Sequence, residues 1–536
     1  MRQFRFARSY TRPLSLAAVV LAVLAVAGVW PETVGGQSRE ETLVIARDID
    51  DVVTNDPSRT FEWTSQIPTH AAYDTLLQIE PPDIAQIRPK LATKWEISPE
   101  GTTYTFQLRP GVKFSSGNPL TAQDVKFSLL RLKNMKDNPS FLVGDIKEIV
   151  VVSDTTVKIV LTAPNASFLG ILAGGVTTGV IDSKTVMAHG GTDAENAKDV
   201  DKATEWLNQN SVGSGPYVLR GWTKNVELVM ERNPHYWGPR PKFARIVFRH
   251  VKSGSTQREM LERGDVDIAM DFDPDLAAKV KGNPKIKVVE GLTSNQIYMG
   301  LNVSPEISKE LSDKRVRQAI AYAIDYDGII QGLMRGAADR PPGMIPLGLL
   351  GVDKAMNRKQ DVNKAKALLK EAGYPGGFTV RFTYYEGLLG TPAEAIAAKI
   401  QSDLAAVGIR ATLDRKERTV AWSEYRSSKS VMILSGWSPD YLDPDPYADA
   451  YYKAGGVVPK RVNWENSRAT ELTLMARKEQ DPKKRAAFYR DIQQIGLDEV
   501  PHIMLLQPKN FVGVAPAIKG YVIHPIWFVG LEHLSR

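Results

Sequence analysis

The feature that most constrains this chain is an alternation of strand and helix patterns that runs, stops and starts again. In the first stretch, short apolar or alternating runs predict strands at residues 43–46, 104–108, 156–161, 226–230, 246–248, 266–270 and 286–289. A helix predicted at 256–263, with Gly264 as its stop, lies between two of them. Strand–helix–strand units predict an α/β sheet.

The same pattern restarts near Val316, where apolar residues recur at helical spacing, and again at 365–372. Strands at 378–384, 409–413 and 431–435 and a helix at 391–407 follow. The last part of the chain predicts a helix at 488–495 and strands at 502–506, 511–514 and 521–523. Because 536 residues are too many for one compact core, we expect two or three domains.

The N-terminus reads as an export signal. Four arginines without an acidic residue precede an apolar stretch at 14–29, and Ala25-Val26-Ala27 fits a cleavage site. The alternative is an uncleaved membrane anchor. The chain has no cysteine, so we expect neither disulfides nor a lipid-modified cysteine. An untethered secreted protein must be retained by an outer membrane, which predicts a periplasmic location.

Charge gives little sign of a nucleic-acid partner. The formal net charge is +7, and four of the positive charges belong to the predicted signal. We find no Lys/Arg cluster interleaved with aromatic residues, which argues against nucleic-acid binding. The run Lys483-Lys484-Arg485 is predicted to be a solvated helix face.

A series of short motifs spans nearly the whole chain after residue 36, in order. They are PKLATKWE at 89–96, GTTYTF at 101–106, LRPGVKF at 108–114, TAQDV at 121–125, VGSGPY at 212–217, NPHYWG at 233–238, RVRQAI at 315–320, AKALLKEAG at 365–373 and KGY at 519–521. This series resembles family 5 of the extracellular solute-binding proteins, which serve peptide and nickel ABC importers.

The resemblance implies a two-lobed α/β fold of the type II periplasmic-binding-protein kind, with an extra subdomain in the first lobe. We expect a signal peptide and linker at 1–36, lobe I at 37–301 with the subdomain at about 58–205, lobe II at 302–491 and a return segment at 492–536. The lobes would hinge near Asn302 and Asp491. The resemblance also implies a small solute and the membrane subunits of an ABC permease as partners, a monomer, no cofactor, no metal and no catalysis.

The best candidate site is the loop that follows strand 431–435, because open α/β sheets bind ligands at the carboxyl ends of strands. Trp437, Ser438, Asp440 and Tyr441 are the candidates there. In peptide-binding relatives, the aspartate three residues after this tryptophan pairs with the ligand's α-ammonium group, and Asp440 matches it. Trp437 would supply an apolar wall and a cation–π face. The following Asp-Pro pairs are typical of turns.

Further candidates come from position alone. Asp48 and Asp50 follow the first strand, where relatives place ligand, although they are also typical of a solvated loop. Tyr384, Tyr385, Glu386 and Trp422 are second-lobe candidates, with core packing as the alternative. Dipeptide-binding relatives carry an arginine after the equivalent of strand 378–384, but here Glu386 stands near that place. This departure argues against strict dipeptide specificity and leaves longer peptides, amino compounds and sugars open.

A metal binder, a hydrolase and a chaperone-like protein are the three alternative functions. The seven histidines show no metal-ligand spacing. A hydrolase lacks a Gly-x-Ser-x-Gly elbow, and the glycines around Ser214 are better explained by tight turns. A chaperone-like protein that binds unfolded chains loosely is the third. The sequence therefore predicts a periplasmic binding component of an ABC importer that takes up a peptide or an amino-bearing compound.

Overall fold

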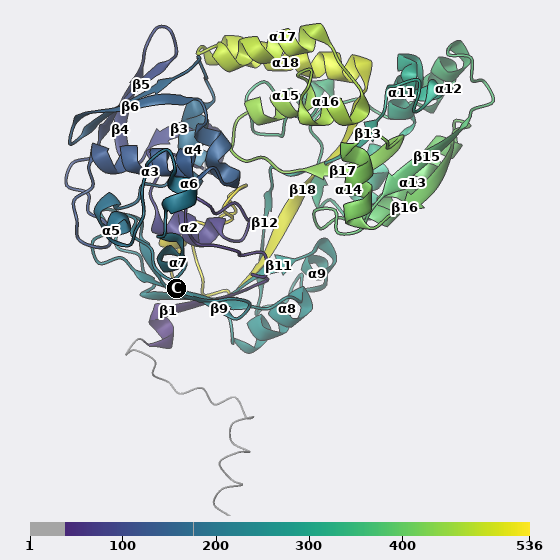
Figure 1. Ribbon diagram of the computed structural model, residues 1–536. Coiled ribbons are helices and arrows are strands. Elements are labelled where there is room, and N and C mark those ends of the chain that lie inside the picture. The colour runs from purple at the N-terminus through teal and green to yellow at the C-terminus, as the bar shows by residue number, and fades with distance from the viewer. Residues whose placement is uncertain (1–37, 175) are drawn as a thin grey trace, which may run out of the picture.

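The computed structural model describes residues 38–174 and 176–536, so the predicted signal at 1–36 lies outside the described part. Two lobes lie side by side, and the long strand β18 (His502–Val514) runs between them (Figure 1). The α/β architecture expected from the alternating patterns is confirmed.

One sheet passes through both lobes. It has twelve strands in the order β16-β15-β17-β13-β18-β11-β1-β10-β9-β8, and β12 and β14 also pair with β18. The strands of lobe I are β1 (Thr42–Arg47), β8 (Tyr217–Thr223), β9 (Glu227–Arg232), β10 (Arg245–His250), β11 (Ile268–Phe272) and β12 (Lys287–Leu292). Helices α8 (Gly254–Arg263) and α9 (Pro274–Lys279) connect them, and Gly264 ends α8 at a φ of 81°.

Lobe II carries the remaining strands of this sheet and most of the long helices. Its strands are β13 (Gln296–Leu301), β14 (Ala338–Asp339), β15 (Thr379–Tyr384), β16 (Arg410–Arg415) and β17 (Met432–Trp437). Its helices are α10 (Lys309–Ser312), α11 (Lys314–Ala323), α12 (Val362–Glu371), α13 (Ala393–Ala405), α14 (Arg418–Arg426), α15 (Asp445–Tyr451), α16 (Val457–Val462), α17 (Ser467–Lys478) and α18 (Pro482–Glu499).

The chain crosses between the lobes at two places. Residues 297–300 of β13 pair with the first part of β18, and β12 pairs with its second part, from Lys509 onward. β18 therefore serves both halves of the sheet as one strand, and residues 293–295 and 507–508 lie between the two sets of pairings.

A separate four-stranded antiparallel sheet forms the extra subdomain. Its order is β4-β5-β7-β6, and a β2–β3 hairpin lies beside it in the chain. The bounds are β2 (Leu77–Glu80), β3 (Asp83–Pro89), β4 (Ala92–Ile97), β5 (Thr103–Leu108), β6 (Ile146–Ser153) and β7 (Thr156–Leu161). The helices of this region are α2 (Gln66–Ala72), α3 (Ala122–Met135), α4 (Phe168–Gly174), α5 (Ser183–Ala188), α6 (Ala197–Val200) and α7 (Thr204–Leu207).

One predicted strand is wrong. Residues 521–523 form no strand, although Tyr521 and Ile523 are buried. A β-carbon on Gly291 would come within 2.7 Å of the Ile523 side chain, so this segment packs against β12 without pairing with it. Its apolar alternation reflects that packing.

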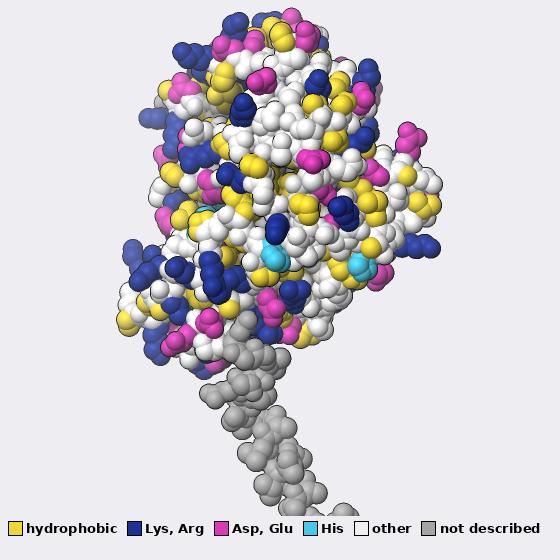
Figure 2. All heavy atoms as spheres, turned by 90° about the vertical axis from the view of Figure 1, so that its left-hand side faces the viewer, with side chains coloured by type: hydrophobic (Ala, Val, Ile, Leu, Met, Phe, Trp, Pro, Cys, Tyr) yellow, Lys and Arg dark blue, Asp and Glu magenta, His cyan; other side chains and the backbone are white. Residues whose placement is uncertain are grey.

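The surface carries mixed charge. On the face turned to the viewer in Figure 2, acidic and basic side chains lie among one another and among hydrophobic side chains. Among the described helices, none is both long enough and apolar enough to cross a bilayer. The described residues also contain no cluster of three or more His, Asp or Glu side chains suited to a metal ion.

Candidate functional site

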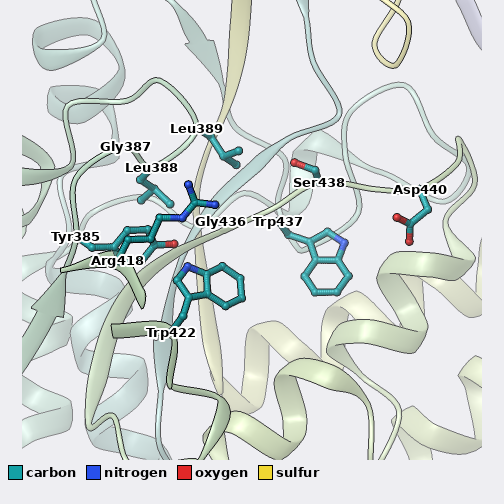
Figure 3. Close-up of a pocket in the computed structure, with 10 residues that line it drawn as sticks. All are labelled: Tyr385, Gly387, Leu388, Leu389, Arg418, Trp422, Gly436, Trp437, Ser438 and Asp440. Atoms are coloured by element: carbon teal, nitrogen blue, oxygen red, sulfur yellow. The ribbon is translucent and has the colours of Figure 1, made fainter. Parts of the chain in front are cut away.

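A cavity of about 320 Å³ lies where two lobe II strands end. The residues lining it come from the loop after β15, from the start of α14 and from the end of β17 (Figure 3). They are Tyr385, Gly387, Leu388, Leu389, Arg418, Trp422, Gly436, Trp437, Ser438 and Asp440. Strands β15 and β17 are parallel neighbours, so their carboxyl ends meet at this edge of the sheet.

Asp440 is an unpaired carboxylate in this cavity. No hydrogen bond or ion pair from the described residues reaches its side chain. Burial alone raises the pKa of Asp440 from 3.8 to about 6, because an ionised carboxylate loses hydration there without gaining a partner. The site therefore has a strong acceptor available for a cationic or donor group.

Trp437 forms the wall beside Asp440. Its ring packs edge-on against Tyr451, with centroids 5.7 Å apart. Its Nε1 is buried and has no acceptor among the described residues, and in Figure 3 it lies on the side of the ring turned to Asp440. An N–H donor and a carboxylate acceptor thus lie at the same end of the cavity.

Arg418 supplies a positive charge on the other side of Trp437 (Figure 3). It is the first residue of α14, and its side chain is in no ion pair with any described residue. Sequence reasoning missed this residue. Its signal was the spacing to Trp422, because residues four apart share one face of a helix. Arg418 is the one Lys or Arg residue among those that line the cavity.

Contacts of Ser438, Tyr385 and Trp422 hold the cavity in shape. The Ser438 hydroxyl donates to Asn295 Oδ1 at 2.9 Å, which ties the loop after β17 to the crossing segment at 293–295. Tyr385 and Trp422 lie with ring centroids 6.4 Å apart. Burial raises the pKa of the Tyr385 hydroxyl, which therefore stays protonated at neutral pH.

The structure gathers half of the candidates from the sequence and separates the rest. Tyr385, Trp422, Trp437, Ser438 and Asp440 share the cavity. The others do not line it: Tyr384 packs in the lobe II core, Glu386 is exposed, Tyr441 packs against Leu142 and Ile171 of the subdomain, and Asp48 and Asp50 lie in lobe I near His250 and Lys252.

The loop behind the cavity is fixed by a buried ion pair. Arg485 Nη1 donates to Asp443 Oδ2 at 2.8 Å and its Nη2 donates to Oδ1 at 2.5 Å. The prediction that Arg485 is solvated is therefore wrong, while Lys483 and Lys484 are exposed. Asp443 is a structural residue of this loop.

Ser214 has no features of a nucleophile. It is fully buried and its hydroxyl donates to Asp74 Oδ2 at 2.8 Å. The flanking glycines are required by close packing, because a β-carbon on Gly213 would lie 2.0 Å from the carbonyl oxygen of Ala72. The structure thus explains these glycines by their close contact with the end of α2.

A two-lobed α/β fold with a cavity at the strand ends of one lobe defines the class of solute-binding proteins. The chain belongs to family 5 of the bacterial extracellular solute-binding proteins, since the profile described as "Bacterial extracellular solute-binding proteins, family 5 Middle" matches residues 86–458. Members of this class bind small solutes for ABC importers and carry out no chemical reaction on them, as the sequence indicated.

Two relatives come from Escherichia coli K12. The "Probable D,D-dipeptide-binding periplasmic protein" is 29% identical over 91% of this chain and 92% of its own length. The "Dipeptide-binding protein" is 30% identical over 84% and 86%. Among solved structures, HbpA2 from Haemophilus parasuis has a TM-score of 0.81 at 25% identity and covers 92% of this chain and 99% of its own. Other relatives are named for heme and glutathione.

Proposed function

We propose that this chain is the periplasmic binding component of an ABC importer for short peptides with a free amino terminus. The observation that carries the proposal is Asp440, a desolvated carboxylate without a partner in the described part of the chain. An α-ammonium group would complete a charge-assisted hydrogen bond with it. The first carbonyl oxygen of the same peptide would accept from Trp437 Nε1, which is buried beside it.

Arg418 suits the other end of such a ligand. Its guanidinium group can bind a carboxylate in a bidentate manner, and no described carboxylate engages it. A second cavity of about 600 Å³ is lined by Arg418, Thr419, Trp422, Ser423, Arg426 and Ser427. Because the two cavities share Arg418 and Trp422, we propose ligands longer than a dipeptide.

Capture would involve closure of the two lobes. All residues lining the 320 Å³ cavity belong to lobe II, so a ligand there would gain contacts with the lobe I sheet only as the lobes approach each other. We propose that lobe I comprises residues 38–292 and 509–536, and that residues 293–295 and 507–508 form the hinge. A ligand that contacts both lobes shifts the population toward the closed state, which the permease subunits would recognise. The export signal at 1–36 would deliver the chain to the periplasm.

Calorimetry with a defined peptide set tests the proposal. We expect tri- and tetrapeptides with free termini to bind, and N-acetylated forms to bind at least about 30-fold more weakly, since the loss of a desolvated ion pair costs about 2 kcal/mol or more. Asp440→Asn should weaken the free peptides by a similar factor. Glu386→Gln is the matched control, because Glu386 is exposed outside the cavity. Equal binding of free and N-acetylated peptides would refute the role of Asp440.

A further inference from the structure

A third cavity, much smaller than the two described above, lies in lobe II and shares no lining residue with them. It measures about 20 Å³ and lies between the segment at 340–358, the end of α18 and the start of β18. Its lining includes Tyr326, Arg340, Arg358, Tyr452 and His502. A space of this size holds one water molecule or one monatomic ion and excludes sulfate, phosphate and carboxylates.

Two guanidinium groups line this cavity, and their hydrogen-bond partners are neutral. Arg340 donates from Nε to the Met504 carbonyl at 3.3 Å and from Nη1 to the Arg358 carbonyl at 2.7 Å. Arg358 donates from Nη2 to the Leu497 carbonyl at 2.6 Å. Across the described ranges, no ion pair joins either arginine to a carboxylate.

The surroundings concentrate positive charge without balancing it. The guanidinium carbon of Arg340 lies 3.3 Å from the ring centroid of Tyr326, and that of Arg358 lies 4.6 Å from the ring of Tyr322. Lys364 Nζ approaches the same Tyr322 ring at 4.3 Å. Burial lowers the pKa of Arg340, Tyr326 opposes this, and the smaller effects of Arg358 and Asp327 lower and raise it respectively. Arg340 and Arg358 are half-buried, so their charges are only partly solvated while no described carboxylate forms an ion pair with either.

His502 adds an unused hydrogen-bond donor. Its side chain is almost fully buried, and neither ring nitrogen has a partner among the described residues. Burial lowers its pKa to about 3, so the ring is neutral and carries one N–H. A buried donor without an acceptor loses free energy. An anion in the cavity would accept from this group and offset both guanidinium charges.

We propose that a monatomic anion, chloride under ordinary conditions, occupies this cavity and is held by Arg340, Arg358 and the N–H of His502. The ion ties the segment at 340–358 to α18 and β18, and so strengthens lobe II close to the strand that crosses between the lobes. This site does not depend on the proposed peptide function, since it shares no residue with the solute cavity.

Bromide tests the site because it substitutes for chloride and scatters anomalously. The full mature chain is dialysed into gluconate, and bromide is added at constant ionic strength. We expect an anomalous peak between Arg340, Arg358 and His502 in crystals grown with bromide. We also expect bromide to raise Tm by about 2 °C relative to gluconate, since an ion that binds only the folded state stabilises it.

Variants of Arg340 and Arg358 test whether these residues cause the bromide-dependent rise in Tm. Arg340→Met and Arg358→Met should each lose the bromide-dependent rise in Tm. Arg335→Met is the matched control, because Arg335 precedes this segment, does not line the cavity and pairs with Asp275 at 3.3 Å on the surface. Wild-type crystals in bromide with only a water-like peak at the site would overturn the proposal. So would an unchanged bromide response in both cavity variants. The diffraction measurement holds even where a variant fails to fold.

Discussion

At the scale of single residues, Asp440 is a carboxyl group whose burial favours the protonated form and which has no partner to favour the ionised one. The pKa of Asp440 is about 6 in the folded protein and near 3.8 in an unfolded chain. A folded-state pKa above the unfolded one means that the folded protein binds the proton more tightly. Stability of the empty protein therefore falls as pH rises from about 4 to about 6, and the full loss is present above that range.

Replacing this carboxylate should consequently stabilise the empty protein. We expect Asp440→Asn to raise the free energy of unfolding by about 2 kcal/mol at pH 7.5 and to have no effect below about pH 4. Urea unfolding of both proteins across that pH range measures the difference. A variant that is less stable than the wild type at pH 7.5 would mean that Asp440 has an internal partner.

The residue scale also shows how far sequence reasoning reaches. The loop with Trp437 was predicted from its place after an apolar strand and Asp440 from the resemblance to peptide-binding relatives, and the structure puts both in the cavity. Arg418 was missed although its spacing to Trp422 puts both on one face of α14, because the position of α14 beside the end of β15 is a long-range property. Arg485 was assigned to a solvated run, although its guanidinium group is buried against Asp443. A buried cation is recognisable only when the distant carboxylate is known.

At the scale of elements, most strands of the two lobes followed from hydrophobic periodicity, since burial of one or both faces is a local signal, but β8, β13 and the two-residue β14 were not predicted. β18 did not follow as one strand, because Gln507-Pro508-Lys509 interrupts its apolar pattern. Pro508 nevertheless lies inside the strand, where its carbonyl accepts from Thr293 Oγ1 at 2.8 Å. Pairing with strands from both lobes thus outweighs the local preference against a strand.

The contact between the loop at 213–215 and the end of α2 gives a test at this scale. Gly213→Ala should lower the free energy of unfolding by about 3 kcal/mol or more, because its β-carbon would overlap the backbone of Ala72. Gly221→Ala in β8 is the control, since nothing lies within 4 Å of a β-carbon there. Thermal unfolding of the two variants should differ clearly, and equal Tm values would contradict the packing argument.

At the scale of the whole molecule, the subdomain is attached to lobe II as well as to lobe I. The Ala166 amide donates to the Arg477 carbonyl at 2.7 Å, and Ser167 Oγ donates to Asp445 Oδ2 at 3.2 Å. Tyr441 packs against Leu142 and Ile171 beside them. Tyr441 and Asp445 follow Asp440 in the same loop and helix start and do not line the cavity, so the subdomain holds the chain that continues from the solute site.

Ligand-driven closure should therefore be uneven. Because the chain contains no cysteine, pairs of introduced cysteines can carry spin labels without interference. We expect the distance between labels at Lys224→Cys in lobe I and Lys366→Cys in lobe II to shorten when a bound peptide is added. Labels at Lys94→Cys in the subdomain and Lys484→Cys on α18 should keep their separation. All four positions are exposed. A constant first distance would argue against a hinge at 293–295 and 507–508.

The unpaired carboxylate of Asp440 also bears on how this sequence changes over generations. A side chain that lowers stability and has no other role is readily replaced, because substitutions there that restore stability are not opposed by selection for function. Populations of this protein selected only for heat resistance should lose Asp440 early, while populations grown on the imported solute should retain it. The persistence of one destabilising aspartate would thus report, without any assay of binding, whether the solute matters to the cell.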